Sequence, residues 1–191
     1  VMGHAGDDYH SHGEIMYRNC RVPAGNLLGP RGQGFVIAQE RLGPGRIHHC
    51  MRWIGICNRS FQIMCQRAAT RQVGHGKTLG EKQIVQEWIA QSRAEILAAR
   101  LMVLNAAWKI ENQGVYAARE EISLIKFYVA PIMLSVVDRA IQVHGGMGVS
   151  DDTILSFFYR SERAARIYDG PDEVHKIVCS RRILREYRPA T

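Results

Sequence analysis

Apolar residues recur at alternating steps of three and four positions in three long stretches of the chain, Ile47–Ala68, Val85–Ile110 and Ala118–Val136. This spacing places the apolar side chains on one face of an α-helix. Ser92 is the one polar residue in the stripe of the second stretch. We therefore predict three long amphipathic helices whose stripes form a common core.

Glycine and proline mark where these helices stop. Gly43-Pro44-Gly45 separates a predicted short helix, Phe35–Leu42, from the first long helix, which we expect to end near Gln72. The second helix is expected to stop at Gly114 and the third at Gly145-Gly146. Short connections of this kind favour antiparallel packing of neighbouring helices.

The two ends of the chain carry weaker patterns. Residues 14–22 alternate like a β-strand, and shorter helices are predicted at 153–163 and 171–187, the latter with Pro171 at its first helical position. We expect an all-α fold, an up-and-down four-helix bundle at 35–191 preceded by a short β segment within 1–34.

Composition and charge narrow the class of protein. The 191 residues are 46% apolar and 23% charged, which is typical of a globular protein with a substantial core. The net charge of +7 suits an anionic ligand. No nucleic acid partner is expected, because aromatic residues are not interleaved with Lys and Arg on one face. No stable membrane insertion is expected either, since no run of about 18 apolar residues occurs.

The cysteines and the beginning of the chain bear on the compartment. The chain has five cysteines and no Cys-x-x-Cys pair, which argues against a disulfide scaffold or a structural zinc site. Cys50 and Cys57 are expected to be buried in one helix, too far apart to bridge. Val1 opens the chain without a basic segment followed by an apolar one, so we expect no secretory signal. We expect a protein that is not secreted, mitochondrial or peroxisomal if eukaryotic and cytoplasmic if bacterial.

Four local patterns are candidate sites. Asp7–His12 is rich in possible metal ligands but has no helix to converge them, so we expect no metal site. Gly29–Gly34 has the glycines of a phosphate-binding loop but no βαβ context, which favours a turn.

The double glycine within Gln142–Gly148 is either a helix C-cap or a surface that a ligand approaches closely. Asp169-Gly170-Pro171 places a carboxylate at a helix start, either as an N-cap or as a functional group.

Taken together, these segments resemble the acyl-CoA dehydrogenases, flavoproteins with an N-terminal helical domain, a middle β domain and a C-terminal helical bundle. Arg18–Phe35 is similar to the closing segment of the middle domain, so 1–34 would be its remnant. Gln142–Gly146 resembles the stretch beside the flavin adenine of a partner subunit, and Tyr168-Asp169-Gly170 resembles the family's Tyr-Glu-Gly.

The resemblance implies an FAD-dependent α,β-dehydrogenation of an acyl-CoA thioester, as in fatty acid β-oxidation, by an enzyme of which this chain is a C-terminal fragment. It implies Asp169 as the catalytic base. The implied substrate-binding residues are Arg46, Tyr168 and Gly170, and the implied cofactor-binding residues are Arg71, Gln83, Gln142, Gly145, Gly146 and Glu173. It further implies an electron-transfer flavoprotein as acceptor and a homodimer or homotetramer. The alternative is an inactive helical oligomerisation module of a larger flavoprotein.

Three departures from the family pattern distinguish this sequence. The base position holds Asp169, one methylene shorter than the usual Glu, and Gly45 occupies the place where some members carry the base. Residues 169–175, Asp-Gly-Pro-Asp-Glu-Val-His, resemble a subgroup that is sometimes fused to phosphotransferase domains and is associated with long or branched acyl-CoAs and 4-hydroxy acids. The loop at 72–76 lacks the usual Phe-Gly and is one residue longer.

Overall fold

The computed structural model describes residues 13–188, and these residues contain helices but no strand. The chain divides into two compact units, Val1–Arg41 and Leu42–Thr191. Helix α1 (Gly34–Thr70) begins in the first unit, and most of its length belongs to the second.

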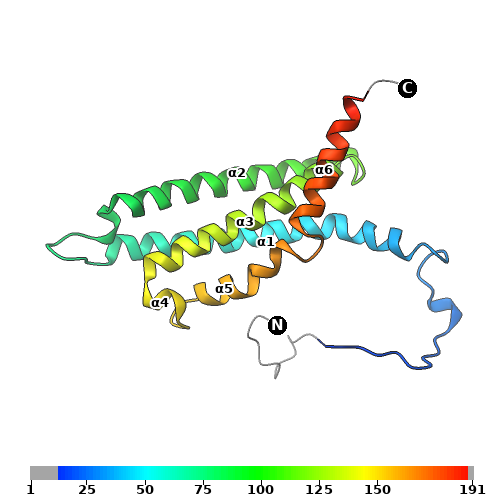
Figure 1. Ribbon diagram of the computed structural model, residues 1–191, viewed down its shortest axis with the longest axis horizontal. Coiled ribbons are helices and arrows are strands. Elements are labelled where there is room, and N and C mark those ends of the chain that lie inside the picture. Colours follow the sequence, from blue (N-terminus) through cyan, green and yellow to red (C-terminus); the bar gives the residue numbers. More distant parts are fainter. Residues whose placement is uncertain (1–12, 189–191) are drawn as a thin grey trace. The chain divides into compact units, whose positions relative to one another are not determined.

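Three long helices dominate the second unit, α1, α2 (Gln83–Gln113) and α3 (Arg119–His144), and they run lengthwise beside one another (Figure 1). Shorter helices follow, α4 (Gly146–Val149), α5 (Leu155–Glu162) and α6 (Asp172–Glu186). Three 3-10 turns complete the described part, η1 (Ala24–Asn26), η2 (Leu79–Glu81) and η3 (Arg163–Arg166). The all-α prediction is confirmed for these residues.

The core shows that neighbouring helices alternate in direction. One buried cluster joins the early part of α1, the late part of α2 and the early part of α3, including Trp53, Val103 and Ile122. A second cluster joins the late part of α1, the early part of α2 and the late part of α3, including Met64, Val85 and Val143. Helix α5 runs from one cluster to the other. Its first residue, Leu155, belongs to the second cluster, and its last residue, Glu162, accepts a hydrogen bond from Trp53 of the first cluster. The up-and-down bundle is therefore confirmed, with α5 as its fourth wall.

Ser92 is fully buried, and its surroundings explain a polar residue in an apolar stripe. Arg139 Nη1 of α3 donates hydrogen bonds to Ser92 Oγ at 3.1 Å and to Glu95 Oε2 of α2 at 2.6 Å. A buried hydroxyl is costly unless it is hydrogen-bonded, and here the cross-helix ion pair satisfies it. The same contact fixes the register of α2 against α3.

The predicted break at Gly43-Pro44-Gly45 is wrong, because α1 is continuous from Gly34 to Thr70. Proline usually breaks a helix by removing a donor and by crowding the preceding turn. Here Gly43 is buried, and a Cβ on it would lie only 3.0 Å from Val115 Cγ1. Close packing at Gly43 and burial of Ile47 hold the segment in place despite Pro44.

The predicted strand at 14–22 is also wrong, since residues 13–23 form no regular element. A lone strand leaves its backbone groups unpaired, and the described residues offer no second strand to pair with it. The glycine-rich segment before α1 forms the expected turn, in which Gln33 N donates to Pro30 O at 3.2 Å. The assignment of 1–34 and 35–191 to separate domains stays a prediction.

The remaining elements follow the sequence pattern closely. Helix α2 ends at Gly114, whose φ of 85° is the left-handed conformation of a C-cap, and α5 falls within the predicted 153–163. Helix α6 starts at Asp172, so Pro171 is its N-cap and not its first helical residue. The short helix α4, which starts at the second glycine of the pair, was not expected. No helix among residues 13–188 is long and apolar enough to cross a membrane.

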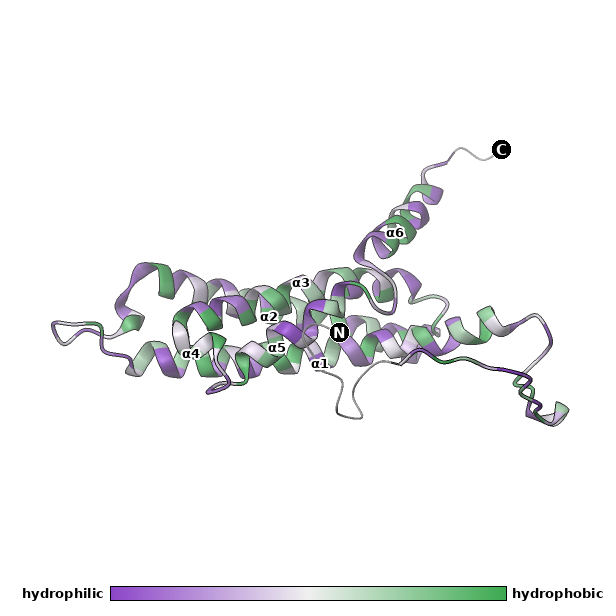
Figure 2. Ribbon diagram, turned by 60° about the horizontal axis from the view of Figure 1, so that its bottom comes forward, coloured by the Kyte–Doolittle hydropathy of each residue, from purple (hydrophilic) through white to green (hydrophobic). Residues whose placement is uncertain are grey.

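Hydropathy alternates along the long helices, while α6 packs against α3 through buried residues such as Cys179 and its C-terminal end projects from the bundle (Figure 2). Cys50 and Cys57 are fully buried free thiols in α1, as expected. Burial raises the pKa of each thiol to about 12. Both are therefore packing residues and not nucleophiles.

Candidate active site around Asp169

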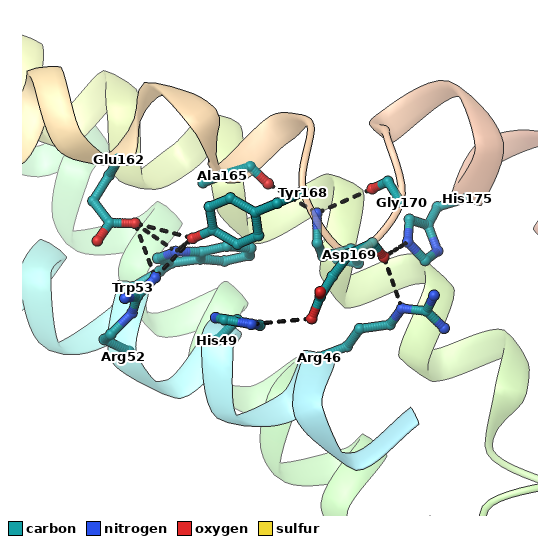
Figure 3. Close-up of polar contacts among 11 residues, drawn as sticks. Arg46, His49, Arg52, Trp53, Glu162, Ala165, Tyr168, Asp169, Gly170 and His175 are labelled. Carbon is teal, nitrogen blue, oxygen red and sulfur yellow. Dashed lines mark hydrogen bonds and ion pairs between the residues drawn. The ribbon is translucent and has the colours of Figure 1, made fainter. Parts of the chain in front are cut away.

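Asp169 lies in the connection between η3 and α6, where the backbone takes an uncommon conformation. Its φ is 54° and that of Gly170 is 102°, both in the left-handed region. Glycine adopts this conformation freely, and among the other residues it is uncommon except for Asn and Asp. The turn directs the Asp169 carboxylate toward α1, where Arg46 and His49 lie (Figure 3).

Side chains from three helices hold the main chain of this connection. Lys126 Nζ of α3 donates to Ala165 O at 2.8 Å and to Gly170 O at 3.2 Å. Arg46 Nε of α1 donates to Asp169 O at 3.0 Å, and His175 Nε2 of α6 lies 3.2 Å from the same oxygen. The backbone that carries the carboxylate is therefore fixed on several sides.

Lys126 has no exposed surface, although lysine is among the residues least often buried. Burial lowers its pKa, and the nearby Asp172, Cys50 and Asp169 oppose that shift. The ammonium group also lies 5.3 Å from the centre of the Trp53 ring. Its role is structural, because its protons are used by the two carbonyl groups of the Asp169 connection.

The Asp169 carboxylate is only partly covered, with 16% of its side chain exposed. His49 Nε2 lies 3.0 Å from Asp169 Oδ2, which is the distance of an ion pair. Oδ2 nevertheless receives no well-aligned hydrogen bond from the described residues. A carboxylate with unused lone pairs in a partly dry site is suited to accept a proton.

His49 packs against two aromatic rings. Its imidazole stacks on Trp53 with 5.9 Å between ring centres and an interplanar angle of 22°, and it lies 5.1 Å from the Tyr168 ring. Burial lowers the pKa of His49, and the negative charge of Asp169 works against that effect. The neutral imidazole is therefore favoured at neutral pH.

The Trp53 and Tyr168 rings are held by hydrogen bonds to Glu162 and Arg52. Arg52 Nη2 and Trp53 Nε1 both donate to Glu162 Oε2 at 3.0 Å. The hydroxyl group of Tyr168 accepts from Arg52 at 2.7 Å and donates to Glu162 at 3.2 Å. Burial and the adjacent Glu162 raise the pKa of Tyr168 to about 12. Tyr168 is therefore neutral and serves as a fixed wall of the site.

The residues expected at the substrate are thus brought together from distant parts of the chain. Arg46 and Asp169 are 123 positions apart and make direct contact. Tyr168 and Gly170 flank Asp169 in the sequence, so all four of these residues form one group. Glu173 is exposed in the first turn of α6, close in sequence to the base.

The other residues expected to bind the cofactor lie at the opposite end of the bundle. Arg71 follows the end of α1, Gln83 starts α2, and Gln142 and Gly145 end α3. The length of α1 from His49 to Thr70 is about 31 Å at the helical rise of 1.5 Å per residue. Within one chain, the Asp169 carboxylate and these residues therefore lie too far apart to contact one small ring.

This opposite end has features that a dinucleotide requires. Arg71 and Gln142 are exposed and offer a cation and an amide to a polyphosphate or an adenine ring. A Cβ at Gly145 or Gly146 would meet no atom within 4 Å, so the backbone there is open to close approach. The residues present fit an adenine dinucleotide such as FAD.

Sequence patterns alone missed several residues of the base site, namely His49, Arg52, Trp53, Lys126, Glu162 and His175. One signal was available for Lys126, which stands four positions after Ile122 and three before Val129, on the apolar face. A cation at such a position predicts a buried partner. The possible metal ligands at Asp7–His12 lie outside the described residues.

Comparison with known proteins agrees with this arrangement. A "Probable acyl-CoA dehydrogenase FadE2" of Mycobacterium tuberculosis is 54% identical over 88% of this chain and 41% of its own length. "Acyl-CoA dehydrogenase family member 11" of Rattus norvegicus is 49% identical over 92% of this chain and 22% of its own length. The chain therefore spans less than half the length of these relatives.

Solved structures show the same fold. Butyryl-CoA dehydrogenase of Megasphaera elsdenii superposes with a TM-score of 0.79 and 30% identity, covering 86% of this chain and 42% of that protein. Residues 32–184 match the family described as "Acyl-CoA dehydrogenase, C-terminal domain". The match includes both the connection that carries Asp169 and the opposite end of the bundle, and the chain belongs to the acyl-CoA dehydrogenase family as a C-terminal domain.

Proposed function

We propose that this chain is the C-terminal part of an FAD-dependent acyl-CoA dehydrogenase and supplies its catalytic base, Asp169. The reaction removes a proton from the α-carbon and a hydride from the β-carbon of an acyl-CoA thioester. The observation that carries the proposal is the Asp169 carboxylate, which has unused lone pairs on a backbone held by Arg46, Lys126 and His175.

The residues of the site divide the work of proton removal. Asp169 accepts the α-proton, and Arg46, which bonds its main-chain oxygen, keeps the carboxylate from swinging away. Tyr168 and Trp53 form an aromatic wall that excludes water from one side of the base. Bound FAD supplies the chemistry that no side chain offers, which is acceptance of the hydride.

The cofactor would be held by residues at the opposite end of the bundle, Arg71, Gln83, Gln142, Gly145 and Gly146. Their separation from Asp169 along α1 supports an active site assembled from two copies of the chain, one giving the base and the other contacts to the cofactor. Glu173 lies at the same end of the bundle as Asp169, and it would approach the cofactor that serves the active site containing that Asp169. A homodimer or homotetramer follows from this arrangement.

The details of Asp169–His175 support a finer assignment within the family. An Asp at the base position is one methylene shorter than Glu, which suits a substrate whose α-carbon approaches closer to the chain. We assign the protein to the subgroup of acyl-CoA dehydrogenases that take long, branched or 4-hydroxylated acyl-CoAs and are sometimes fused to phosphotransferase domains. An electron-transfer flavoprotein would reoxidise the cofactor.

The base assignment is tested with Asp169→Asn in the complete enzyme. Asn keeps the size and a polar oxygen, so flavin and acyl-CoA should still bind. Reduction of the flavin by acyl-CoA should slow by about 10²- to 10⁴-fold, the usual contribution of a general base. Asp169→Glu should retain activity. An unchanged rate in Asp169→Asn would show that Asp169 is only a structural residue.

The competing function is an inactive helical oligomerisation module. It differs in one observable, the visible absorbance of bound flavin in the purified complete protein. In a module without catalysis, no acyl-CoA would reduce the flavin, and the absorbance would not change. In the proposed enzyme, a suitable acyl-CoA would reduce the flavin and bleach its absorbance without any added catalyst.

A further inference from the structure

We propose that His49 is the positioning residue of the base, its neutral imidazole donating Nε2–H to Asp169 Oδ2 and leaving Oδ1 free to take the α-proton. This inference rests on the proposed function and deepens it. The observation behind it is the 3.0 Å separation of His49 Nε2 and Asp169 Oδ2, between residues 120 positions apart in the chain (Figure 3).

The distance is already that of a hydrogen bond, although the alignment is not. A rotation of the imidazole or of the carboxylate brings the N–H into line with Oδ2. Hydrogen bonds in active sites are often poorly aligned before substrate binds and tighten in the complex. Asp169 Oδ1 accepts no hydrogen bond from residues 13–188, so it is the oxygen available to the substrate.

The site is built to hold the imidazole in one orientation. His49 packs against the rings of Trp53 and Tyr168, which also contact each other, and both rings are bonded to the carboxylate of Glu162. Glu162 in turn pairs with Arg52, one turn after His49 on α1. A ring fixed in this way loses little freedom when it engages Asp169, which is the requirement for a positioning group.

The charges around His49 determine which form of the imidazole is present. Arg52 on its own helix and Lys126 on α3 lower the pKa of His49, in the same direction as burial, whereas Asp169 raises it. His175 of α6 contacts the Asp169 main chain, and burial lowers its pKa as well. The neutral form therefore dominates at neutral pH, and a neutral imidazole beside a carboxylate places its proton on the nitrogen that faces it.

A short base has a particular need for such a partner. Asp169 is attached to the backbone by one methylene, and its φ of 54° makes the direction of the carboxylate depend on a strained connection. Neutral His49 fixes that direction without adding a full positive charge. A protonated His49 would hold the carboxylate in an ion pair and weaken it as a base, so protonation of His49 in acid should slow the reaction.

The first test measures the pair without cofactor or substrate. NMR titration of the histidine rings in this protein identifies His49 as the signal lost in His49→Gln. Asp169→Asn removes the negative charge beside His49, and the pKa of His49 should then fall by about one unit or more. A pKa of His49 that does not change in Asp169→Asn overturns the pairing.

The second test measures flavin reduction by acyl-CoA in the complete enzyme. His49→Leu removes the donor and should slow the reaction by about 10- to 100-fold, the value of a hydrogen bond to a charged group. His49→Gln restores an N–H at similar reach and should recover most of the rate. His48→Gln, the same change at the exposed neighbouring position, is the matched control and should behave as wild type.

The pH profile separates positioning from a general structural role. Protonation of His49 should contribute to the loss of activity of wild type in acid, and this contribution should be absent from His49→Gln. If His49→Leu does not fold, the comparison of the wild-type and His49→Gln pH profiles is sufficient to test the role of His49. Identical acid limbs in wild type and His49→Gln, or an unchanged rate in His49→Leu, overturn the inference and leave the proposed function standing.

Discussion

Lys126 is the residue whose role in the site is clearest from its surroundings alone. It is a buried cation that neither touches the Asp169 carboxylate nor faces solvent, and it donates to two carbonyl oxygens on either side of the base. Its value lies in ordering the connection at 165–170.

Lys126→Met should lower both the stability of the protein and its activity. The Met side chain keeps the apolar stem but leaves the Ala165 and Gly170 carbonyl groups without their donor, at a cost of about 1–3 kcal/mol in the free energy of unfolding. Flavin reduction in the complete enzyme should fall as well, because Asp169 loses its support. Urea unfolding and stopped-flow reduction measure the two effects, and Lys77→Met, at an exposed position, should change neither.

At the residue scale the sequence marked Asp169 and Arg46, which the structure brings into contact, but not the side chains around them. Tyr168-Asp169-Gly170 and Arg46 were marked by a family resemblance, and their roles stay a prediction. Nothing in the sequence joins His49 to Asp169 or Trp53 to Glu162, because each pair meets only after more than 100 residues of chain have folded. Such contacts depend on how the helices are packed, which local patterns do not encode.

At the scale of elements, periodicity predicted α2 and α3 almost to their ends, because glycine stops them both. It failed at Pro44, where packing around Gly43 outweighs a local breaker. It failed again at 14–22, where a strand pattern has no partner among the described residues. Both failures have one cause, since a local preference is kept only where the tertiary surroundings permit it.

Gly148 supports a prediction at this scale. A Cβ on Gly148 would clash with the Ile141 carbonyl group and lie 2.8 Å from Ile141 Cα, so α4 can pack against α3 only with glycine there. Gly148→Ala should lower the free energy of unfolding by about 1–3 kcal/mol. In the complete enzyme it should also weaken flavin retention, because the Gln142–Gly146 surface would shift.

Gly55→Ala is the matched control for that change. Gly55 lies in the middle of α1, is exposed, and would meet no atom within 4 Å with a Cβ. The better helix propensity of alanine should raise the free energy of unfolding by up to about 1 kcal/mol. Equal effects of the two substitutions in thermal unfolding would contradict the packing account of Gly148.

At the scale of the molecule, α2 presents a second apolar stripe to solvent. Leu97, Leu101, Leu104 and Trp108 repeat at steps of four and three, and each has more than half of its surface exposed. Monomeric proteins rarely expose a contiguous apolar patch of this kind. We expect another copy of the chain to cover it.

Leu101→Asp should therefore reduce the oligomer. A charge placed in the middle of a buried apolar face opposes association, and sedimentation at micromolar concentration should show a smaller species than wild type. Asn105→Asp adds the same charge at a nearby exposed position on α2 and should leave the assembly unchanged. A wild-type protein that sediments only at 21.6 kDa would refute the expectation.

The separation of Asp169 from Arg71 along α1 has a genetic consequence. If each active site takes its base from one copy and its cofactor contacts from another, two inactive variants can repair each other. In a hybrid dimer of Asp169→Asn and Arg71→Ala subunits, one site would carry both defects and the other site neither. Coexpression of the two variants should thus yield hybrids with about half the activity of the wild-type dimer, since one of the two sites is intact. The same two substitutions placed in a single chain should yield none.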